Sequence, residues 1–426
     1  MSVYKFELSK YRAVEHAEIV IDGITVLAGE NGTGKSTISR FLYYVVKVLS
    51  EYESLIDNVA RQDLLQVITR MERASLLVRK DNFNFPYKEL LEYLHKNSIS
   101  DVVDKLLVVV DQFGTKLDMT IRNSEDVKTL LARFATLFGK ENLVDLDVNE
   151  VVSSIVSLLR SKCLAIADET AKKKNTRSSE TFVELSSSLT DNFEYGPVDL
   201  NFYEDGVNLL SEDHFNPILN LNRVIYYKTY ELMDYLEKTS DFHRCLVKTN
   251  DKMTDQERMV ARVLKGILGG DVVLSDDDFM PVKQLHFKRE DGLDIPLKQA
   301  ATGLVSFSYL ARLLENGYLR EGTLLIIDEP EAHLHPKWIV EYARILVMLQ
   351  KCLNLKILLS THNPDMLAAI DAVARKHGVV NSTNFYFATS DKDNKYQYNY
   401  QKLDSIEEIF DSFNTALIKI QEYGQN

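Results

Sequence analysis

Residues 29–36 read Gly-Glu-Asn-Gly-Thr-Gly-Lys-Ser, which fits the pattern G-x-x-x-x-G-K-[ST]. The five residues before it, 24–28, form a short apolar run with β-branched side chains, which predicts a buried strand. After it, apolar residues recur at helical spacing and predict a helix with Ile38, Phe41, Leu42, Val45, Val46 and Leu49 on its buried face. A glycine-rich turn between a strand and a helix is the setting in which this pattern cradles phosphate groups.

The loop carries the groups that a nucleoside triphosphate, ATP or GTP, requires. Its glycines allow a tight turn, so that backbone N–H groups and the helix N-terminus surround the phosphates. Lys35 is expected to reach the β- and γ-phosphates, and Ser36 to ligate Mg²⁺. The expected nucleotide-binding residues are Gly29, Asn31, Gly32, Thr33, Gly34, Lys35, Ser36 and Thr37.

A second motif lies nearly three hundred residues later. Residues 324–327 are four apolar residues without alternation, as expected for a strand buried on both faces of a parallel sheet. The strand ends in Asp328 and Glu329. We expect Asp328 to hold Mg²⁺ through water, and Glu329 to orient and deprotonate the water that attacks the γ-phosphate.

A third strand is predicted at residues 356–359, followed by the polar residues Ser360, Thr361 and His362. In an α/β protein, ligands bind at the carboxyl edge of the sheet. We therefore expect the strand ends near residues 28, 328 and 361 to lie side by side, with His362 donating a hydrogen bond to the γ-phosphate. Lys35, Glu329 and His362 form the expected catalytic set.

Together these motifs resemble the ATP-binding-cassette ATPases, in the branch that contains RecF, SMC-like and OLD (overcoming lysogenization defect) proteins. The block 328–336, Asp-Glu-Pro-Glu-Ala-His-Leu-His-Pro, looks like the OLD version of the carboxylate motif. Residues 4–12 and 19–21 are similar to the first strands of that branch. The resemblance implies an α/β fold with a mixed or parallel core sheet and a small antiparallel sheet. It also implies ATP and Mg²⁺ as cofactors, and a homodimer or higher oligomer that sandwiches ATP.

The family has a signature loop that reaches the ATP of a second subunit, but its usual sequence Leu-Ser-Gly-Gly-Gln is absent here. Residues 299–303, Gln-Ala-Ala-Thr-Gly, stand before a predicted helix. The resemblance implies that Thr302, which keeps the hydroxyl of the serine in the OLD-like Ser-Gly form, and Gly303 contact nucleotide. Threonine is also a good helix N-cap. An ordinary capped helix is the alternative. No glutamine stands out for the family's glutamine loop.

The order of the motifs predicts a discontinuous ATPase core. Residues 1–49 form its first part, residues 50–178 a helical insertion, and residues 179–426 its second part. The insertion lacks a sustained heptad repeat, so a long coiled coil is not expected. The polar run 172–179 is interpreted as a solvated connection, with contact to nucleic acid or to an acidic partner as the alternative. Residues 182–185, 193–195 and 198–203 are interpreted as strands. A hairpin is predicted from residue 286 to residue 295, across Asp291-Gly292.

Composition excludes some functions. The 426 residues carry a formal net charge of −13, which argues against a general nucleic-acid coat but leaves a local basic groove open. The isolated Cys163, Cys245 and Cys352 are typical of buried thiols in a reducing cytosol. Without a signal-peptide pattern or an 18-residue apolar run, we expect a cytoplasmic protein without a membrane span. His333 and His335 have no helical ligand spacing, so no transition-metal site is expected.

The function expected from the resemblance is that of a regulatory ATPase. About sixty residues follow His362, too few for the Toprim nuclease domain of OLD proteins, so any effector is expected to be a separate chain. Stand-alone OLD-like cassettes resemble the ATPase subunits of bacterial anti-phage systems such as Septu and PARIS, which control an effector that is usually a nuclease. Two alternatives are a RecF- or SMC-like repair ATPase that acts directly on DNA, and an ATP-gated scaffold with little turnover.

Overall fold

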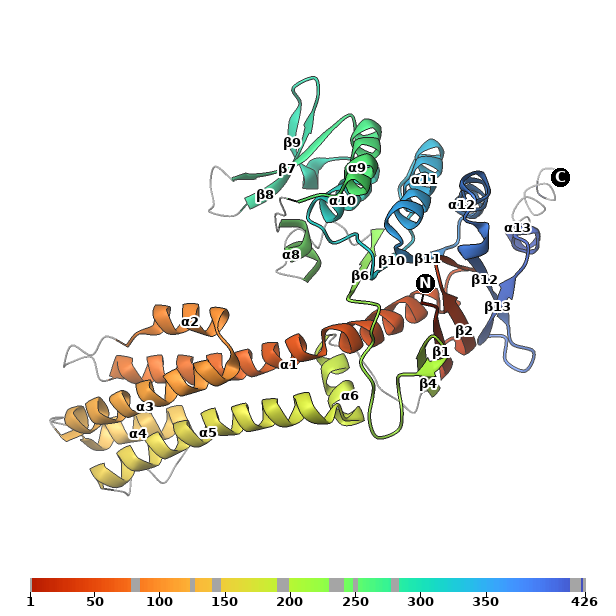
Figure 1. Ribbon diagram of the computed structural model, residues 1–426. Helices are drawn as coiled ribbons and strands as arrows, with labels where there is room; N and C mark the ends of the chain where they lie inside the picture. Colours follow the sequence, from red (N-terminus) through yellow and green to blue (C-terminus); the bar gives the residue numbers. More distant parts are fainter. Residues whose placement is uncertain are drawn as a thin grey trace. The chain divides into compact units, whose positions relative to one another are not determined.

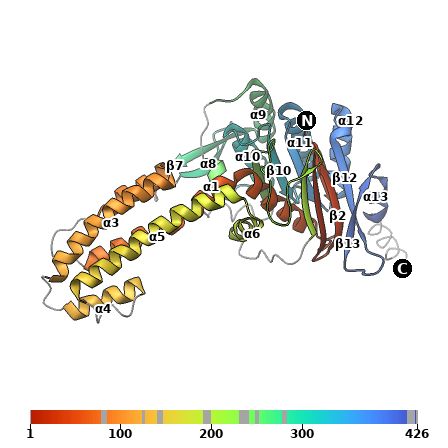
Figure 2. The same cartoon turned by 60° about the horizontal axis from the view of Figure 1, so that its bottom comes forward.

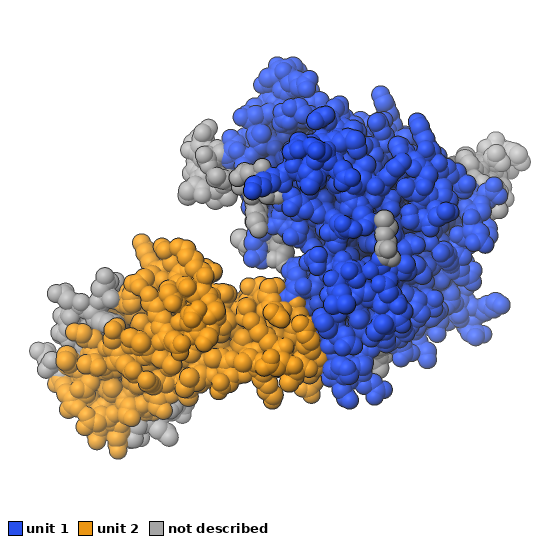
Figure 3. Space-filling view, in the orientation of Figure 1, with its two compact units in different colours: residues 1–51, 182–426 blue, residues 52–181 orange. Residues whose placement is uncertain are grey.

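The computed structural model describes residues 2–77, 85–122, 127–139, 147–189, 199–229, 241–247, 252–276, 283–413 and 423 (Figure 1). The strand predicted at residues 193–195 lies outside them. The chain forms two compact units, one of residues 1–51 and 182–426 and the other of residues 52–181 (Figure 3). Among the described residues, no helix combines the length and the apolarity needed to cross a membrane.

The first unit is built on a ten-stranded sheet with the order β5-β4-β1-β2-β13-β12-β3-β11-β10-β6. Its parallel part contains β12 (Thr383–Ser390), β3 (Ile24–Ala28), β11 (Lys356–Thr361), β10 (Thr323–Asp328) and β6 (Arg223–Lys228). Because β3, β11 and β10 are neighbours, the prediction that their carboxyl ends lie side by side is confirmed.

The other strands make the sheet mixed. The first two predicted strands are confirmed as the antiparallel pair β1 (Tyr4–Tyr11) and β2 (Val14–Ile21). β4 (Asp199–Glu204) pairs with β1, and β5 (Val207–Asn208) with β4, both antiparallel. β13 (Tyr398–Leu403) joins the two parts, since it pairs parallel with β2 and antiparallel with β12. The expected α/β fold with a mixed core sheet is thus confirmed.

A separate three-stranded antiparallel sheet contains β7 (Gly270–Asp276), β8 (Lys283–Arg289) and β9 (Asp294–Pro296). The pairing of β8 with β9 confirms the predicted hairpin. Helix α9 (Asp255–Leu268) precedes this sheet and starts with a capping box of Thr254 and Glu257. The short helices α8 (Asp241–Val247) and η4 (Leu297–Gln299) stand before α9 and after β9 in the chain.

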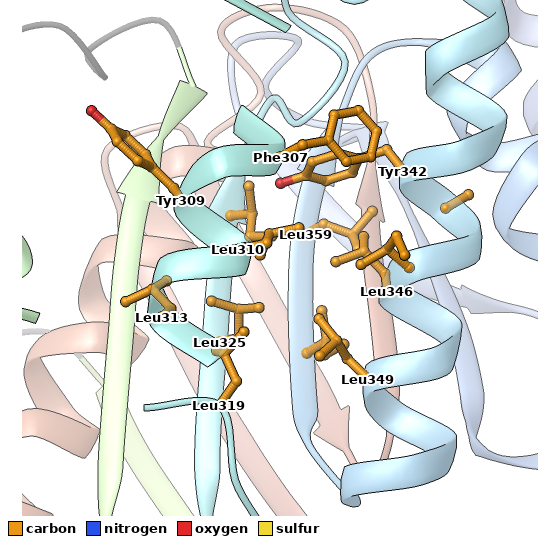
Figure 4. Packing of buried hydrophobic residues seen from close by; sticks show 14 of the residues in the cluster. Phe307, Tyr309, Leu310, Leu313, Leu319, Leu325, Tyr342, Leu346, Leu349 and Leu359 are labelled. Atoms are coloured by element: carbon orange, nitrogen blue, oxygen red, sulfur yellow. The ribbon is translucent and has the colours of Figure 1, made fainter. Parts of the chain in front are cut away.

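One face of the parallel strands is covered by α10 (Thr302–Glu315), α11 (Pro336–Leu353) and α12 (Pro364–His377). Figure 4 shows α10 and α11 packing their leucines onto Leu325 of β10 and Leu359 of β11. The 3-10 turn η5 (Val380–Ser382) and the helix α13 (Glu407–Phe413) complete the elements of this unit. The continuous apolar runs of the sequence are explained, because β3, β10 and β11 are buried along their whole length.

The opposite face is covered by the start of α1 (Lys35–Leu77), the helix that follows the phosphate loop (Figure 2). Tyr43 of α1 packs on Tyr226 of β6, with ring centroids 5.5 Å apart. The neighbours of Tyr226 in the strand, Ile225 and Tyr227, belong instead to the cluster under α10 and α11. Successive side chains of a strand point to opposite faces, so α1 and α10 lie on different sides of the sheet.

The second unit is helical and has a hydrophobic core of its own. It contains the rest of α1, which bends at the non-helical Glu51, followed by α2 (Tyr87–Lys96), α3 (Ile99–Arg122), α4 (Val127–Phe138) and α5 (Val148–Thr176). The described core residues include Leu64, Ile68, Met71, Leu106, Phe113, Phe134, Ile155 and Leu159. Helix α5 starts with a capping box of Asp147 and Glu150.

Two local predictions are wrong. Residues 182–185 belong to a helix, α6 (Ser179–Ser188), not to a strand. Its buried residues Thr181, Phe182, Leu185 and Ser186 follow helical rather than alternating spacing. The run 172–179 is no solvated connection, because α5 continues to Thr176 and Lys174 forms an ion pair of 2.7 Å with Asp57 of α1.

Candidate nucleotide-binding site

The loop after β3 has the backbone that its glycines permit. Gly32 and Gly34 have φ angles of 86° and 96°, in the region that disfavours side chains. A Cβ atom on Gly34 would lie 2.7 Å from Cγ2 of Val14, so only glycine fits there. Helix α1 begins at the next residue, Lys35, and its N-terminus therefore opens into the loop.

Lys35 is 6% exposed, and its ammonium lies at the centre of the loop. Nζ donates hydrogen bonds to the carbonyl oxygens of Gly29 (2.7 Å) and Glu30 (2.6 Å). Burial lowers the pKa of Lys35, while the nearby carboxylates of Glu329, Glu331 and Asp328 oppose this shift. An ammonium carries three donors, so the two bonds within the loop leave one for a ligand.

Two further hydrogen bonds hold the loop in place. The hydroxyl of Thr33 donates to the carbonyl of Glu30 (2.9 Å), and Tyr400 of β13 donates to the carbonyl of Thr33 (3.3 Å). The loop is thus held by its own side chains and by a strand from the end of the chain. Asn31 is exposed, and Ser36 and Thr37 are half-buried in the first turn of α1.

Asp328 ends β10 and is fully buried. Its Oδ1 accepts a hydrogen bond from the Ser360 hydroxyl of β11 (2.5 Å), and its Oδ2 accepts one from the Tyr226 hydroxyl of β6 (2.9 Å). Burial, and then the Asp328 carboxylate, raise the pKa of Tyr226, so this phenol remains a donor. Both neighbouring strands therefore fix the orientation of the Asp328 carboxylate.

Glu329 has the left-handed φ angle of 53°. For a residue with a side chain this conformation costs about 1–2 kcal/mol. It is held by hydrogen bonds from Glu329 N to the Ser360 carbonyl (2.9 Å) and from Ala332 N to the Glu329 carbonyl (3.0 Å). The chain turns sharply here, and the Glu329 side chain remains 27% exposed while Asp328 is buried. Strained backbone of this kind is found at functional sites.

His362 lies after β11, between two carboxylates. Its Nδ1 is 3.7 Å from Oε1 of Glu329 and 3.8 Å from Oε1 of Glu331, both beyond hydrogen-bond distance. Glu331 is fixed to the same strand end, because its Oε1 accepts from the Thr361 hydroxyl (2.6 Å) and from His362 N (3.3 Å). A small movement of the imidazole toward either carboxylate would form a hydrogen bond.

Two buried polar atoms at this point have no hydrogen-bond partner among the described residues: Oε2 of Glu331 and Nδ1 of His362. Burial raises the pKa of Glu331, although its hydrogen bonds with Thr361 and His362 oppose the shift. Buried polar atoms without partners are costly, and they indicate that water or a polar ligand belongs beside them.

The residues present fit a magnesium nucleotide. The loop presents N–H groups and an ammonium to phosphate, and the hydroxyl of Ser36 and the carboxylate of Asp328 are the oxygen ligands that Mg²⁺ prefers. Nδ1 of His362, one of the two unpartnered atoms, lies 3.7 Å from Oε1 of Glu329, where a bound water would supply a hydrogen-bond partner.

Thr302 and Gly303, the predicted signature residues, lie at the start of α10 and not in the phosphate loop. Helix α10 starts at Thr302, and its N-cap is Ala301, whose carbonyl accepts from Val305 N (3.1 Å); the prediction that Thr302 caps the helix is therefore wrong. A Cβ atom on Gly303 would lie 2.9 Å from Trp338, so the glycine lets α10 pack against the start of α11. In the described part of the chain, no hydrogen bond joins Thr302 or Gly303 to the phosphate loop.

Sequence reasoning missed four residues of the site: Tyr226, Glu331, Ser360 and Thr361. Glu331, Ser360 and Thr361 stand beside the predicted residues, and only their contacts mark them. Tyr226 had a usable signal, since residues 223–227 are a short β-forming run, but β6 was not predicted. β6, the neighbour of β10, ends at Lys228, which pairs with Asp328. This position therefore does not supply the glutamine of the family's glutamine loop.

Comparison with known proteins identifies a family. Residues 1–367 match the family described as AAA ATPase domain. Over 400 residues the chain is 21% identical to "Retron Vc95 probable ATPase" of Vibrio cholerae serotype O1 biovar El Tor, covering 85% of this chain and 70% of that protein.

Two solved structures are also similar to the chain. The Smc head domain with an extended coiled coil, bound to the C-terminal domain of ScpA, from Pyrococcus furiosus, has a TM-score of 0.36 at 12% identity over all of both chains. The SMC head domain of Thermotoga maritima has a TM-score of 0.37 at 10% identity, over 95% of this chain and 100% of that one. TM-scores of this size establish no common fold, so the strand order described above defines the fold.

Proposed function

The chain belongs to the AAA ATPase domain family, and we propose that it binds ATP with Mg²⁺ and hydrolyses it to ADP and phosphate. One observation carries this proposal. Lys35, Asp328 and Glu329 meet at one edge of the sheet, although the sequence separates Lys35 from the two acids by almost three hundred residues. This is the set of charges that phosphoryl transfer to water requires.

The residues divide the work as follows. Loop N–H groups and Lys35 would hold the β- and γ-phosphates. Ser36 and Asp328 would hold Mg²⁺, which would supply positive charge to the phosphate oxygens. Glu329 accepts a proton from the attacking water. The oxygen of that water bonds to the γ-phosphorus, and the bond between the γ-phosphorus and the oxygen of the departing ADP breaks. Nδ1 of His362 faces Glu329 and Glu331. The other ring nitrogen, Nε2, is then the atom that donates a hydrogen bond to the γ-phosphate in this proposal.

A second subunit completes the site in this proposal. Thr302 and Gly303 begin α10, a helix of 14 residues whose N-terminus favours an anion. Because they make no hydrogen bond to the loop of their own chain in the described structure, we assign them to the γ-phosphate of a partner copy. Two copies related by a twofold axis would then form two sites, each with the loop of one chain and Thr302 of the other.

This arrangement predicts recovery of activity on mixing two inactive variants. Lys35→Ala disables the loop of its chain, and Thr302→Ala removes the hydroxyl offered to the partner. In an equal mixture, half of the dimers are mixed, and each has one intact site. Phosphate release is therefore expected to recover to about a quarter of the activity of the unaltered chain. A mixture no more active than the average of its components would show that Thr302 acts within its own chain, or not at all.

The biological role that we propose is that of a sensor and regulatory subunit in bacterial anti-phage defence, with a separate, nuclease-like effector under its control. The similarity to a retron ATPase over 85% of the chain supports this role. The chain is expected to co-purify with the product of a neighbouring gene, and ATP is expected to change the amount bound at least about fivefold. If the chain instead binds DNA alone, with a steep dependence on salt, the alternative of a DNA repair ATPase gains support.

A further inference from the structure

A cavity of about 410 Å³ lies along β6, and no residue of the phosphate loop lines it. Its described walls come from α1, β6, α8 and Tyr318 after α10, all in the same unit. The wall from α8 is well anchored, because the side chain of Asn316 donates to the carbonyls of Cys245 (2.7 Å) and Leu246 (2.9 Å). The volume lies in the usual range for small-molecule sites, roughly 300–1,000 Å³.

The described lining of the cavity carries a net positive charge, although the protein is acidic. Its described lining has three cations, Lys47, Arg223 and Arg244, and one carboxylate, Glu51, which sum to a formal charge of +2. Glu51 already forms an ion pair of 2.6 Å with Lys47. The chain as a whole carries −13, so a local excess of positive charge among the described residues favours an anionic ligand there.

Arg223 is held in a fixed position. Its Nη1 donates to the carbonyl of Gly317 (3.1 Å), and its guanidinium lies 4.5 Å from the ring centroid of Tyr318. A guanidinium carries five donors in a planar fork that matches the oxygens of a phosphate. Arg223 thus offers a positioned fork to an anion within the cavity.

Four aromatic residues also line the cavity. They are Tyr43, Tyr226, Tyr318 and Phe242. Aromatic faces stack well on the ring of a ligand, and beside guanidinium groups they suit a molecule with both a flat ring and an acid group. A nucleoside monophosphate has this combination of ring and anion.

The side chain of Tyr226 connects the cavity to the nucleotide site. Tyr226 lines the cavity and donates through its hydroxyl to Oδ2 of Asp328. The same hydroxyl accepts a weak hydrogen bond of 3.4 Å from Nε of Arg40 on α1, the helix that starts at Lys35. A ligand that shifts Tyr226 would therefore alter the carboxylate proposed to hold Mg²⁺.

We propose that this cavity binds a small anionic aromatic molecule of the nucleoside monophosphate class, and that its occupation changes ATP turnover through Tyr226. The binding part stands on the cavity and its charges. The regulatory part rests on the proposed function.

Binding is tested by calorimetry on the full chain with Lys35→Ala, in which the ATP site is disabled. Titration with AMP, GMP, CMP and UMP is expected to give at least one Kd below about 1 mM. Adding Arg223→Ala is expected to weaken that binding at least tenfold, because a charge-assisted hydrogen bond to phosphate is lost. Arg258→Ala, which removes an exposed arginine of α9, is the matched control and is expected to have no effect.

Three results would overturn the binding proposal: no monophosphate binds, Arg223→Ala and Arg258→Ala behave alike, or inorganic phosphate alone binds as tightly as the best monophosphate. Equally tight binding of inorganic phosphate would show that the aromatic residues of the cavity do not contribute to binding. If the chain with Arg223→Ala fails to fold, as judged by Trp338 fluorescence, Arg244→Ala replaces it, since Arg244 lines the same cavity.

Regulation is tested at saturating ATP on the chain with Lys35 intact. The best monophosphate is expected to change turnover at least about fivefold. Tyr226→Phe keeps the ring and removes the bond to Asp328, so the ratio of turnover with and without the ligand is expected to fall toward one, while calorimetric binding is kept. An undiminished ratio in Tyr226→Phe would overturn the route through Tyr226. A chain without any ATP turnover would contradict the proposed function and leave the calorimetric test of the cavity intact.

Discussion

Lys35→Ala is expected to weaken ATP binding about 10- to 150-fold, because hydrogen bonds to charged groups contribute about 1.5–3 kcal/mol each. The ammonium is buried in the loop and bonded to the carbonyls of Gly29 and Glu30, so it is already positioned for phosphate. Loss of the ammonium also removes the positive charge near the carboxylates of Asp328, Glu329 and Glu331. These carboxylates would then repel the phosphates more strongly. Calorimetry with ATP and Mg²⁺ measures the change in Kd.

Controls separate binding from folding. Lys265→Ala removes an exposed lysine paired with Asp271 and is expected to bind ATP normally. Trp338 is the only tryptophan and lies at the start of α11, so its fluorescence reports whether the first unit is folded. A folded Lys35→Ala chain with unchanged affinity for ATP would disprove the assignment of the phosphate loop.

Glu329→Gln is expected to lower ATP turnover about 10²- to 10⁴-fold, the usual contribution of a general base, and to leave ATP binding intact. Glutamine has nearly the same shape and keeps the backbone bonds to Ser360 and Ala332, but its amide takes no proton from water. The unhydrolysed ATP is expected to hold two copies together. Phosphate release measures turnover, and analytical ultracentrifugation with ATP measures the doubled mass.

Glu331→Gln is the matched comparison, since Glu331 faces the same imidazole but is bonded to Thr361 instead of facing solvent. We expect it to retain more turnover than Glu329→Gln. If Glu329→Gln hydrolyses ATP at the normal rate, Glu329 is not the base, and the alternative of a scaffold with little turnover must be tested on the unaltered chain. A strict monomer with bound ATP would contradict the proposed role of Thr302.

Much of the site could be predicted from the sequence because each of its motifs is a short run of adjacent residues, although the motifs are far apart in the chain. The loop of residues 29–36 is recognised from its glycines and lysine alone. The apolar runs before Asp328 and before Ser360 mark strands that are buried on both faces, and a buried parallel strand needs such a run wherever it is placed. Parallel strands place their carboxyl ends at one edge, so the meeting of three motifs also followed from local pattern.

The sequence pattern gave a wrong prediction where a short stretch of residues suits both a strand and a helix. Residues 182–185, Phe-Val-Glu-Leu, suit a strand by intrinsic preference, yet they form part of α6 because their neighbours Thr181 and Ser186 are buried with Phe182 and Leu185 on one side. The start of α10 was predicted one residue late for a related reason. A threonine is a good cap, but the backbone hydrogen bond from Val305 to Ala301 sets the first turn.

The sequence by itself thus determined the phosphate loop, the two carboxylates after their strand and the histidine after the next, since each requires only a few adjacent residues. Tertiary structure alone decided what holds Asp328: Ser360 lies 32 residues away and Tyr226 lies 102 residues away. It likewise placed Glu331 against Thr361, and the cavity beside β6. These contacts depend on which strands are neighbours, and strand order is set by the packing of the whole sheet, for which no short stretch of residues carries a signal.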